Sequence, residues 1–329
     1  MTASACVRRR IVRHQIHMAA ALVVCGTWLA AVRLADAEPG RGSAVDPASY
    51  EHDVRQAGPS SVRFARRPPQ IGDQTAQTIA VALRLDTMVR QGSEVLEQAK
   101  TSIRRNQRRS ITSTDVASGR TIAATVRYAE ATKQVAAGQS AAELQEGPTT
   151  SQPVEGKAYH CRRDGEELRI TDEHGNIPPL DEFEIVALNM DSLGRSNPLV
   201  DFLAGRAVAV GATIEVPNEL AEKLLGLGDT LGNVTQFRLT LDEVRSVEGA
   251  ECAVFHASVD AASSDSSQMR LQLEGPLLVQ AATCRPVQAS LTGPIGMSET
   301  RGSLTATYQM TGAGKMTVSI GSTYRDATR

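Results

Sequence analysis

The strongest constraint on the fold is an alternation of apolar and polar residues that holds from Val234 to Ile320. Successive runs in this segment carry apolar side chains at every second position, and short polar stretches separate the runs. A period of two places the apolar side chains on one face of a strand, and short connections join antiparallel neighbours. Residues 233–325 are therefore predicted to form an antiparallel meander with one apolar face.

The first half of the chain shows the same strand pattern. Residues 79–85 alternate strictly, and two further strands are predicted over 108–117 and 121–131. The Asp164-Gly165 pair marks a tight hairpin, because this dipeptide accommodates the positive backbone angles that short hairpin turns require. The apolar residues in 94–104 fit both a helix and a strand, and the sequence leaves the two alternatives open.

Between these two halves the apolar period changes to that of a helix. Residues 181–193 have helical spacing, Asn197 offers an N-cap followed directly by a proline, and Pro217 begins a third helical pattern. One strand is expected near 207–216. Residues 180–232 are therefore predicted to be a helical insert.

The amino terminus has the three-part pattern of a secretory signal peptide. Four arginines precede an uncharged apolar run from Met18 to Val32, and the small residues Ala35 and Ala37 follow it. The run has about 15 residues, fewer than the roughly 20 that a membrane-spanning helix needs. We therefore expect cleavage between Ala37 and Glu38, no transmembrane segment after cleavage, and a periplasmic or extracellular protein.

The rest of the chain divides into a leader and one domain. Residues 38–72 are rich in Pro, Gly, Ser and Arg without an apolar period, which predicts a disordered leader. Residues 73–325 are predicted to be a single β-rich domain whose first part, 73–179, contains the N-terminal strands. The predicted fold class is α+β, mostly β: a curved antiparallel sheet, either an open half-barrel or sandwich-like, with two or three helices inserted mid-chain.

Charge and composition exclude a dedicated nucleic-acid binder. The whole chain has 35 basic and 37 acidic residues. Loss of residues 1–37 removes five arginines and one aspartate, which leaves 30 basic and 36 acidic residues. A net negative chain with only 3% aromatic residues is a poor match for phosphate contacts and base stacking.

Two sets of residues are candidate binding sites. The apolar side chains of the insert either line a ligand cavity under the helices or simply fill the core. They are Phe183, Met190, Phe202, Leu203, Leu224 and Leu225. The second set is a dense basic cluster, which either binds an anionic partner such as lipid headgroups or polysaccharide, or is a charged edge that discourages aggregation. It comprises Arg104, Arg105, Arg108 and Arg109.

The sequence predicts no catalytic set, no metal site and no cofactor. His160 and Cys161 are neighbours on a predicted strand and so point to opposite faces, which prevents them from sharing one ion. A hydrolase using His256 or Cys161 is the least favoured hypothesis, because no triad order is present.

In an oxidising compartment Cys161, Cys252 and Cys284 are expected to form one disulfide and leave one thiol, with all three pairings open.

A five-residue pattern occurs twice within the meander. Leu273–Leu277 and Leu291–Ile295 both have a Gly-Pro pair in the middle. Such a short repeat fits a duplicated ligand loop or a matched pair of strand bends, and we favour the bends.

The order of strands and helices over roughly residues 73–325 resembles bacterial envelope proteins of the lipoprotein-carrier type. That resemblance rests on architecture alone and implies a cleaved signal followed by an open half-barrel whose concave face is covered by helices. It includes no specific motif, so no site residue is carried over. Residues 153–159 and 209–217 also look similar to uncharacterised secreted bacterial β-rich proteins.

The sequence leads to two hypotheses for function. The first is a non-enzymatic exported protein that binds a lipid or an apolar peptide between its sheet and its helices. The alternative is a structural or assembly module of the cell envelope, without a ligand cavity, that contacts an envelope protein through its sheet edge or its basic cluster.

Overall fold

The computed structural model describes residues 60–139, 145–225, 233–263, 267–303 and 306–327. Its N-terminal strands are β1 (Ser61–Arg63), β2 (Gln74–Gln91), β3 (Glu94–Ala117), β4 (Arg120–Gly138), β5 (Gln145–Glu146), β6 (Thr150–Ser151), β7 (Ala158–Asp164) and β8 (Glu167–Asp172). The middle contains α2 (Leu180–Met190), α3 (Pro198–Leu203), β9 (Ala207–Ala209), β10 (Thr213–Glu215) and α4 (Asn218–Leu225). The C-terminal strands are β11 (Asn233–Val247), β12 (Ala250–Ala262), β13 (Ser267–Gln280), β14 (Pro286–Ser303) and β15 (Ala306–Arg325).

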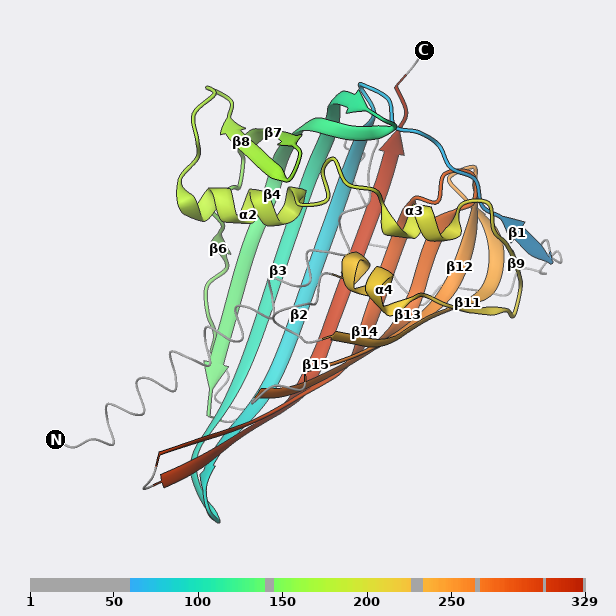
Figure 1. The fold of residues 1–329 in the computed structure, drawn as a ribbon. Coiled ribbons are helices and arrows are strands. Elements are labelled where there is room, and N and C mark those ends of the chain that lie inside the picture. The colour runs from blue at the N-terminus through green and yellow to red at the C-terminus, as the bar shows by residue number, and fades with distance from the viewer. Residues whose placement is uncertain (1–59, 140–144, 226–232, 264–266, 304–305, 328–329) are drawn as a thin grey trace.

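Thirteen of these strands form one antiparallel sheet (Figure 1). Its order is β10-β11-β12-β13-β14-β15-β2-β3-β4-β7-β8, and β5 and β6 also pair with β4. The C-terminal strand β15 pairs with β2 along its length, so the two halves of the chain join in the middle of the sheet. The predicted fold class is confirmed: the protein is mostly β, with an open antiparallel sheet and three short helices mid-chain.

The sheet has one apolar face because the strand period of two is kept across neighbouring strands. In β2 the side chains of Ile79, Val81 and Leu83 are buried, whereas those of Arg84 and Asp86 on the other face are exposed. Residues directly opposite each other on paired strands share a face, so the apolar rows continue from strand to strand. We call the apolar side the inner face.

Residues 94–104, which fitted a helix or a strand, belong to β3. The hairpin of β3 and β4 is longer than predicted at its open end, and Ser118 and Gly119 join the two strands. Ordered structure also begins before the predicted boundary at Asp73. β1 pairs with β9, and Val62 and Phe64 are only 1% exposed. Residues 60–72 are therefore not a disordered leader, because they bury apolar side chains against the main sheet. The predicted signal peptide and residues 38–59 lie outside the described residues.

The helices cover the inner face from its two ends. α2 packs over β4, β7 and β8 in one hydrophobic cluster, while α3 and α4 pack over the C-terminal strands in another (Figure 1). Asn197 caps α3 as predicted, since its Oδ1 accepts a hydrogen bond of 3.0 Å from the Leu199 amide. In the described part of the chain, the middle of β2 and β3 runs between these two covers (Figure 1).

Both edges of the large sheet carry short strands. β10 has three residues and covers part of β11, and at the other edge the two-residue strands β5 and β6 and the hairpin of β7 and β8 flank β4. Short edge strands leave few unpaired backbone groups for another chain to pair with. The described edges therefore offer little to an assembly partner that would add a strand.

The predicted disulfide is wrong: Cys161, Cys252 and Cys284 are all thiols. Cys161 lies in the cluster under α2, while Cys284 lies in the cluster of the C-terminal strands and directs its thiol to the carbonyl of Ala65. Burial raises the pKa of Cys284 to about 11, which suppresses the thiolate needed for disulfide exchange. Cys161 and Cys284 thus lie in separate clusters of the core.

The Gly-Pro pairs repeated in β13 and β14 form a matched pair of close backbone contacts. A Cβ atom at Gly293 would overlap the carbonyl oxygen of Gln272 on β13. A Cβ atom at Gly275 would overlap the carbonyl oxygen of Ser290 on β14. The two glycines thus allow β13 and β14 to approach each other, which supports the interpretation as strand bends.

Replacing Gly293 with alanine is expected to lower the free energy of unfolding by about 2 kcal/mol or more, because a backbone oxygen has no room to move away. Gly296→Ala on the same strand is the matched control, since its added Cβ would lie 4.0 Å from the nearest atom, the Gly312 oxygen. Urea unfolding of both variants measures the difference. Equal stability of the two variants would contradict the close-contact explanation.

Candidate functional site

The apolar residues predicted to line a ligand cavity do not lie together. Phe183 and Met190 pack in the cluster under α2, whereas Phe202, Leu203 and Leu224 pack with the C-terminal strands. Leu225 ends α4, and its side chain lies outside the described residues. The five described side chains fill the spaces between helices and sheet, and Leu224 also lines a small pocket.

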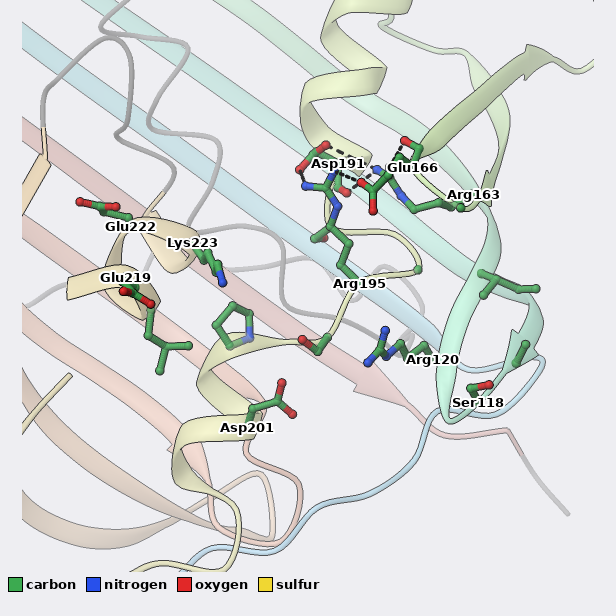
Figure 2. A pocket seen from close by; sticks show the side chains of 18 residues that line it. Ser118, Arg120, Arg163, Glu166, Asp191, Arg195, Asp201, Glu219, Glu222 and Lys223 are labelled. Atoms are coloured by element: carbon green, nitrogen blue, oxygen red, sulfur yellow. Dashed lines mark hydrogen bonds and ion pairs between the residues drawn. The ribbon is translucent and has the colours of Figure 1, made fainter. Parts of the chain in front are cut away.

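A large cleft opens where the helices meet the end of the β3–β4 hairpin, with a volume of about 1330 Å³. Figure 2 shows α4 with Glu219, Glu222 and Lys223 on one side and Arg120 of the hairpin on the other. Most of the lining residues are polar, and they include charges of both signs. Sequence reasoning missed this cleft because its residues come from four loops and helices that the chain order does not bring together.

One wall of the cleft is fixed by Arg163. Its guanidinium donates to the carbonyl oxygens of Leu193, Asp191 and Glu166, and thereby ties the β7–β8 hairpin to the loop after α2 (Figure 2). Arg195 extends this wall through ion pairs to Asp191 at 2.8 Å and to Glu166 at 3.4 Å. These contacts are structural, because each cation already faces acceptors of the chain.

A second, smaller pocket of about 120 Å³ adjoins the cleft and shares Arg120, Arg195 and Lys223 with it. Arg66, Arg67 and Arg285 also line this pocket. Most of these cations are paired with carboxylates: Arg66 with Asp201, Arg195 with Asp191, and both Arg67 and Arg285 with Asp73. Of the six basic side chains that line this pocket, four are thus in ion pairs with carboxylates.

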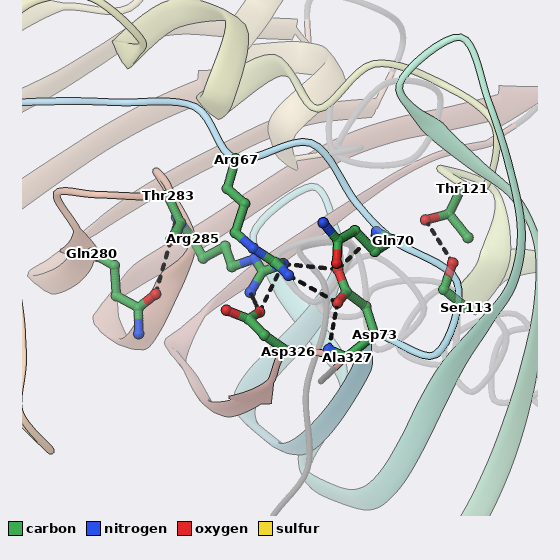
Figure 3. A network of polar contacts seen from close by, with 10 residues as sticks. All are labelled: Arg67, Gln70, Asp73, Ser113, Thr121, Gln280, Thr283, Arg285, Asp326 and Ala327. Atoms are coloured by element: carbon green, nitrogen blue, oxygen red, sulfur yellow. Dashed lines mark hydrogen bonds and ion pairs between the residues drawn. The ribbon is translucent and has the colours of Figure 1, made fainter. Parts of the chain in front are cut away.

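Beside this pocket, Asp73 joins three segments of the chain (Figure 3). The side chain of Asp73 is fully buried and accepts two hydrogen bonds from Arg67, at 2.8 and 3.1 Å. It also accepts from the backbone amides of Gln70 and Ala327 and faces Arg285 at 3.4 Å. Burial acts to raise the pKa of Asp73, but the hydrogen bonds from Arg67 and the backbone outweigh it, and the pKa lies below its ordinary value.

Asp73→Asn is expected to lower the free energy of unfolding at neutral pH by about 2 kcal/mol, because Arg67 and Arg285 lose their buried carboxylate and keep only the half-exposed Asp326 as a shared partner. Folding lowers this pKa, so the stabilisation is complete above the unfolded value of about 3.9 and is lost as the pH falls through the folded value. Urea unfolding from pH 7 to pH 2 should therefore show a shallower acid dependence in the variant.

The control is Asp86→Asn, which removes an exposed carboxylate paired with Lys100. We expect a change below about 0.5 kcal/mol and an unaltered acid dependence. An Asp73 variant with the acid dependence of the wild type would mean that other carboxylates control acid unfolding.

The predicted basic cluster is not one patch, because its arginines lie on one strand and alternate between its faces. Arg104 and Arg108 are exposed on the outer face of β3, and Arg104 faces Glu146 at 3.5 Å. Arg105 and Arg109 are buried on the inner face. The cluster is also not at an edge, since β3 lies between β2 and β4.

Arg109 anchors a polar group on the inner face. It is 1% exposed, and its Nε donates to the Oε1 of Gln77 at 3.1 Å. Tyr128 on β4 lies opposite Arg109 and accepts a hydrogen bond of 3.0 Å from the Asn189 amide of α2. Burial acts to raise the pKa of Tyr128, and the proximity of Arg109 acts against this; the pKa lies above its ordinary value.

A buried carboxylate fixes α2 on the sheet. Glu182 accepts hydrogen bonds of 2.6 Å from the hydroxyl of Tyr159 and from Lys157. Burial acts to raise the pKa of Glu182, but these two donors outweigh it and the pKa lies below its usual range. No local sequence pattern signals this contact, because β8 and a loop separate the two donors from the helix that carries Glu182.

The residues of the hydrolase hypothesis are far apart in the sheet order. His256 lies on the outer face of β12, exposed, with Glu274 4.0 Å from its Nε2. Cys161 is buried on β7, near the opposite edge. Among the described residues no group of three or more His, Cys, Asp or Glu side chains is placed to hold a metal ion.

No family model matches the chain, and no curated protein matches it. Among solved structures, one on lipid–protein interactions in lipovitellin has 7% identity over 79% of this chain, with a TM-score of 0.37. The outer membrane complex of the Klebsiella pneumoniae type II secretion system has 8% identity over 78% of the chain and 41% of its own, with a TM-score of 0.16. The P. putida toluene transporter TodX has 6% identity over 79% of the chain and 91% of its own, with a TM-score of 0.14.

The chain spans 26% of the lipovitellin chain that it matches. These similarities are weak and do not tell what this chain binds. None of the helices in the described residues is long and apolar enough to cross a membrane.

Proposed function

We propose that the protein is a non-enzymatic exported protein that binds the apolar part of a lipid on the inner face of its sheet. One observation carries the proposal: the middle of β2 and β3 runs between the covers formed by α2 and by α3 and α4 (Figure 1). An apolar surface on a one-layer sheet is stable in water only when something covers it. In this proposal an acyl chain joins the buried apolar cluster between the two sets of helices.

The surface in question is continuous across three strands. Val81 of β2 lies opposite Val318 of β15, and Leu83 lies opposite Met316. Val318 in turn lies opposite Leu291 of β14. All five side chains are nearly fully buried. At roughly 4.8 Å between strands, these rows extend about 10 Å across the sheet and follow the strands lengthwise, which suits extended acyl chains.

The alternative hypothesis, an assembly module that acts through a sheet edge, has less support. Both edges carry short strands, and such strands hinder edge-to-edge pairing. The basic cluster, its other proposed contact, is divided between two faces of β3.

Export and cleavage after Ala37 belong to the lipid-binding proposal and rest on the sequence pattern of the amino terminus.

Acyl-chain binding is tested with a tryptophan placed on each face of β15. The chain has a single tryptophan, Trp28, so Met316→Trp and Lys315→Trp are made in a Trp28→Phe background. Met316 is buried on the inner face, and its neighbour Lys315 is exposed on the outer face. We expect a phospholipid with brominated acyl chains to quench the fluorescence of the Met316→Trp variant only.

Quenching of neither reporter, or equal quenching of both, would contradict binding on the inner face.

The intact mass of the protein secreted by its own host tests the export part of the proposal. A chain that begins at Glu38 agrees with it, and a chain that retains the first 37 residues contradicts it.

A further inference from the structure

A polar stretch interrupts the apolar inner face in the middle of β3. Ile103 belongs to the hydrophobic cluster of the C-terminal strands, and Ile111 belongs to the cluster under α2. Between them the inward positions are Arg105, Gln107 and Arg109, all buried. The described core is thus split in two by three polar side chains on one strand.

Within the described residues, the Nε of Arg105 and both amide atoms of Gln107 have no hydrogen-bond partner. Gln107 is 2% exposed, and neither its Oε1 nor its Nε2 makes a hydrogen bond. Arg105 is 6% exposed, its buried Nε makes no hydrogen bond, and among the described residues no carboxylate pairs with it. A buried polar group without a hydrogen bond is strongly unfavourable, so native structures rarely retain one without a function or an unseen partner.

The charges around Arg105 make its position more unfavourable still. Lys133 lies directly opposite Arg105 on β4, and like charges at such paired positions repel each other. Burial lowers the pKa of Arg105 to about 10, the proximity of Arg109 also lowers it, and Tyr128 acts in the opposite direction. Arg105 nevertheless stays protonated at neutral pH. This part of the inner face therefore carries three cations, Arg105, Arg109 and Lys133, and one amide, that of Gln107.

The adjacent rows are apolar. Val81 of β2 lies opposite Arg105, and Ile79 lies opposite Gln107. A molecule that satisfies this stretch therefore needs an anionic group next to an apolar body. Gln107 adds a second requirement: its amide nitrogen is a donor and its oxygen an acceptor, so the anionic group should be accompanied by a hydroxyl group.

We propose that Arg105 and Gln107 bind the headgroup of an anionic phospholipid that carries a hydroxyl group, with its acyl chains on the adjoining rows of β2 and β15. The proposal rests on the proposed function. The phosphate accepts charge-assisted hydrogen bonds from the guanidinium of Arg105, whose planar fork matches two oxygens at once. The hydroxyl donates to Oε1 of Gln107, and Lys133 and Arg109 add long-range attraction.

The test offers the protein two lipids that differ in the headgroup alone. The full chain is incubated with vesicles of equimolar dioleoyl phosphatidylglycerol and dioleoyl phosphatidylcholine, separated from them, and the bound lipid is quantified by mass spectrometry. We expect phosphatidylglycerol to be bound in at least about tenfold excess. Both lipids carry the same phosphate, but choline adds a fixed positive charge next to Arg105, whereas glycerol adds hydroxyl groups and leaves the headgroup anionic. Arg105→Leu removes the cation that disfavours choline, so it should sharply reduce this preference.

Arg108→Leu is the matched control, because it removes the same charge from the outer face of the same strand. It should retain the preference. Gln107→Leu should reduce it in part. If both lipids bind equally and Arg105→Leu changes nothing, the headgroup site is wrong while acyl-chain binding stands. If neither lipid binds and the Met316→Trp variant is not quenched, the proposed function itself is wrong.

Stability without lipid distinguishes a binding role of Arg105 from a structural one. An unpaired buried cation destabilises the lipid-free fold, so Arg105→Leu should raise the midpoint of urea unfolding of the lipid-free protein. A lower midpoint would mean that Arg105 makes a stabilising contact within the chain, and would overturn the proposal.

Discussion

The whole structure depends on covering one apolar face of a single-layer sheet. A sandwich covers such a face with a second sheet, but here the second sheet consists only of β1 and β9 among the described residues. Three short helices therefore take over this role, and each of them covers a limited area. The long strands extend beyond the three helices (Figure 1), and the proposed binding places an acyl chain along the buried apolar rows between them.

Polar contacts fix the covers in place, and they lie at the ends of the sheet. Glu182 holds α2 through Tyr159 and Lys157, and Asp73 joins the segment before β2 to the end of the chain. All of these groups have partners with good geometry, which makes their burial favourable. Arg105 and Gln107 are equally buried in the middle of the sheet, but in the described part of the chain the Nε of Arg105 and the amide of Gln107 have no hydrogen-bond partner. Stability alone does not explain them, whereas a site for a polar headgroup does.

The sequence was sufficient to predict the elements that depend on local patterns. The C-terminal meander follows from a strict period of two, and α3 follows from Asn197 and the proline after it. The leader boundary was wrong because the three residues of β1 gain their order from a partner about 150 positions away, β9. The expected disulfide was wrong because spacing does not tell which part of the core a thiol enters.

The candidate site was only partly predictable for the same reason. The four arginines of β3 were noticed as a cluster, but their meaning depends on strand parity, which was undecided for residues 94–104. Once Ile103 is known to face the core, Arg105 and Arg109 must follow it inward, and Arg104 and Arg108 must face solvent. The cleft of Figure 2 had no local signal, since it forms from loops that meet only in the folded chain.

A crystal structure of the protein purified from its own host under non-denaturing conditions tests the central claim most directly. The account predicts electron density for acyl chains against Val81 and Val318, with a phosphate within hydrogen-bond distance of the Arg105 guanidinium. The account would be contradicted if the density showed no bound acyl chain on the inner face and a carboxylate of the same chain paired with Arg105.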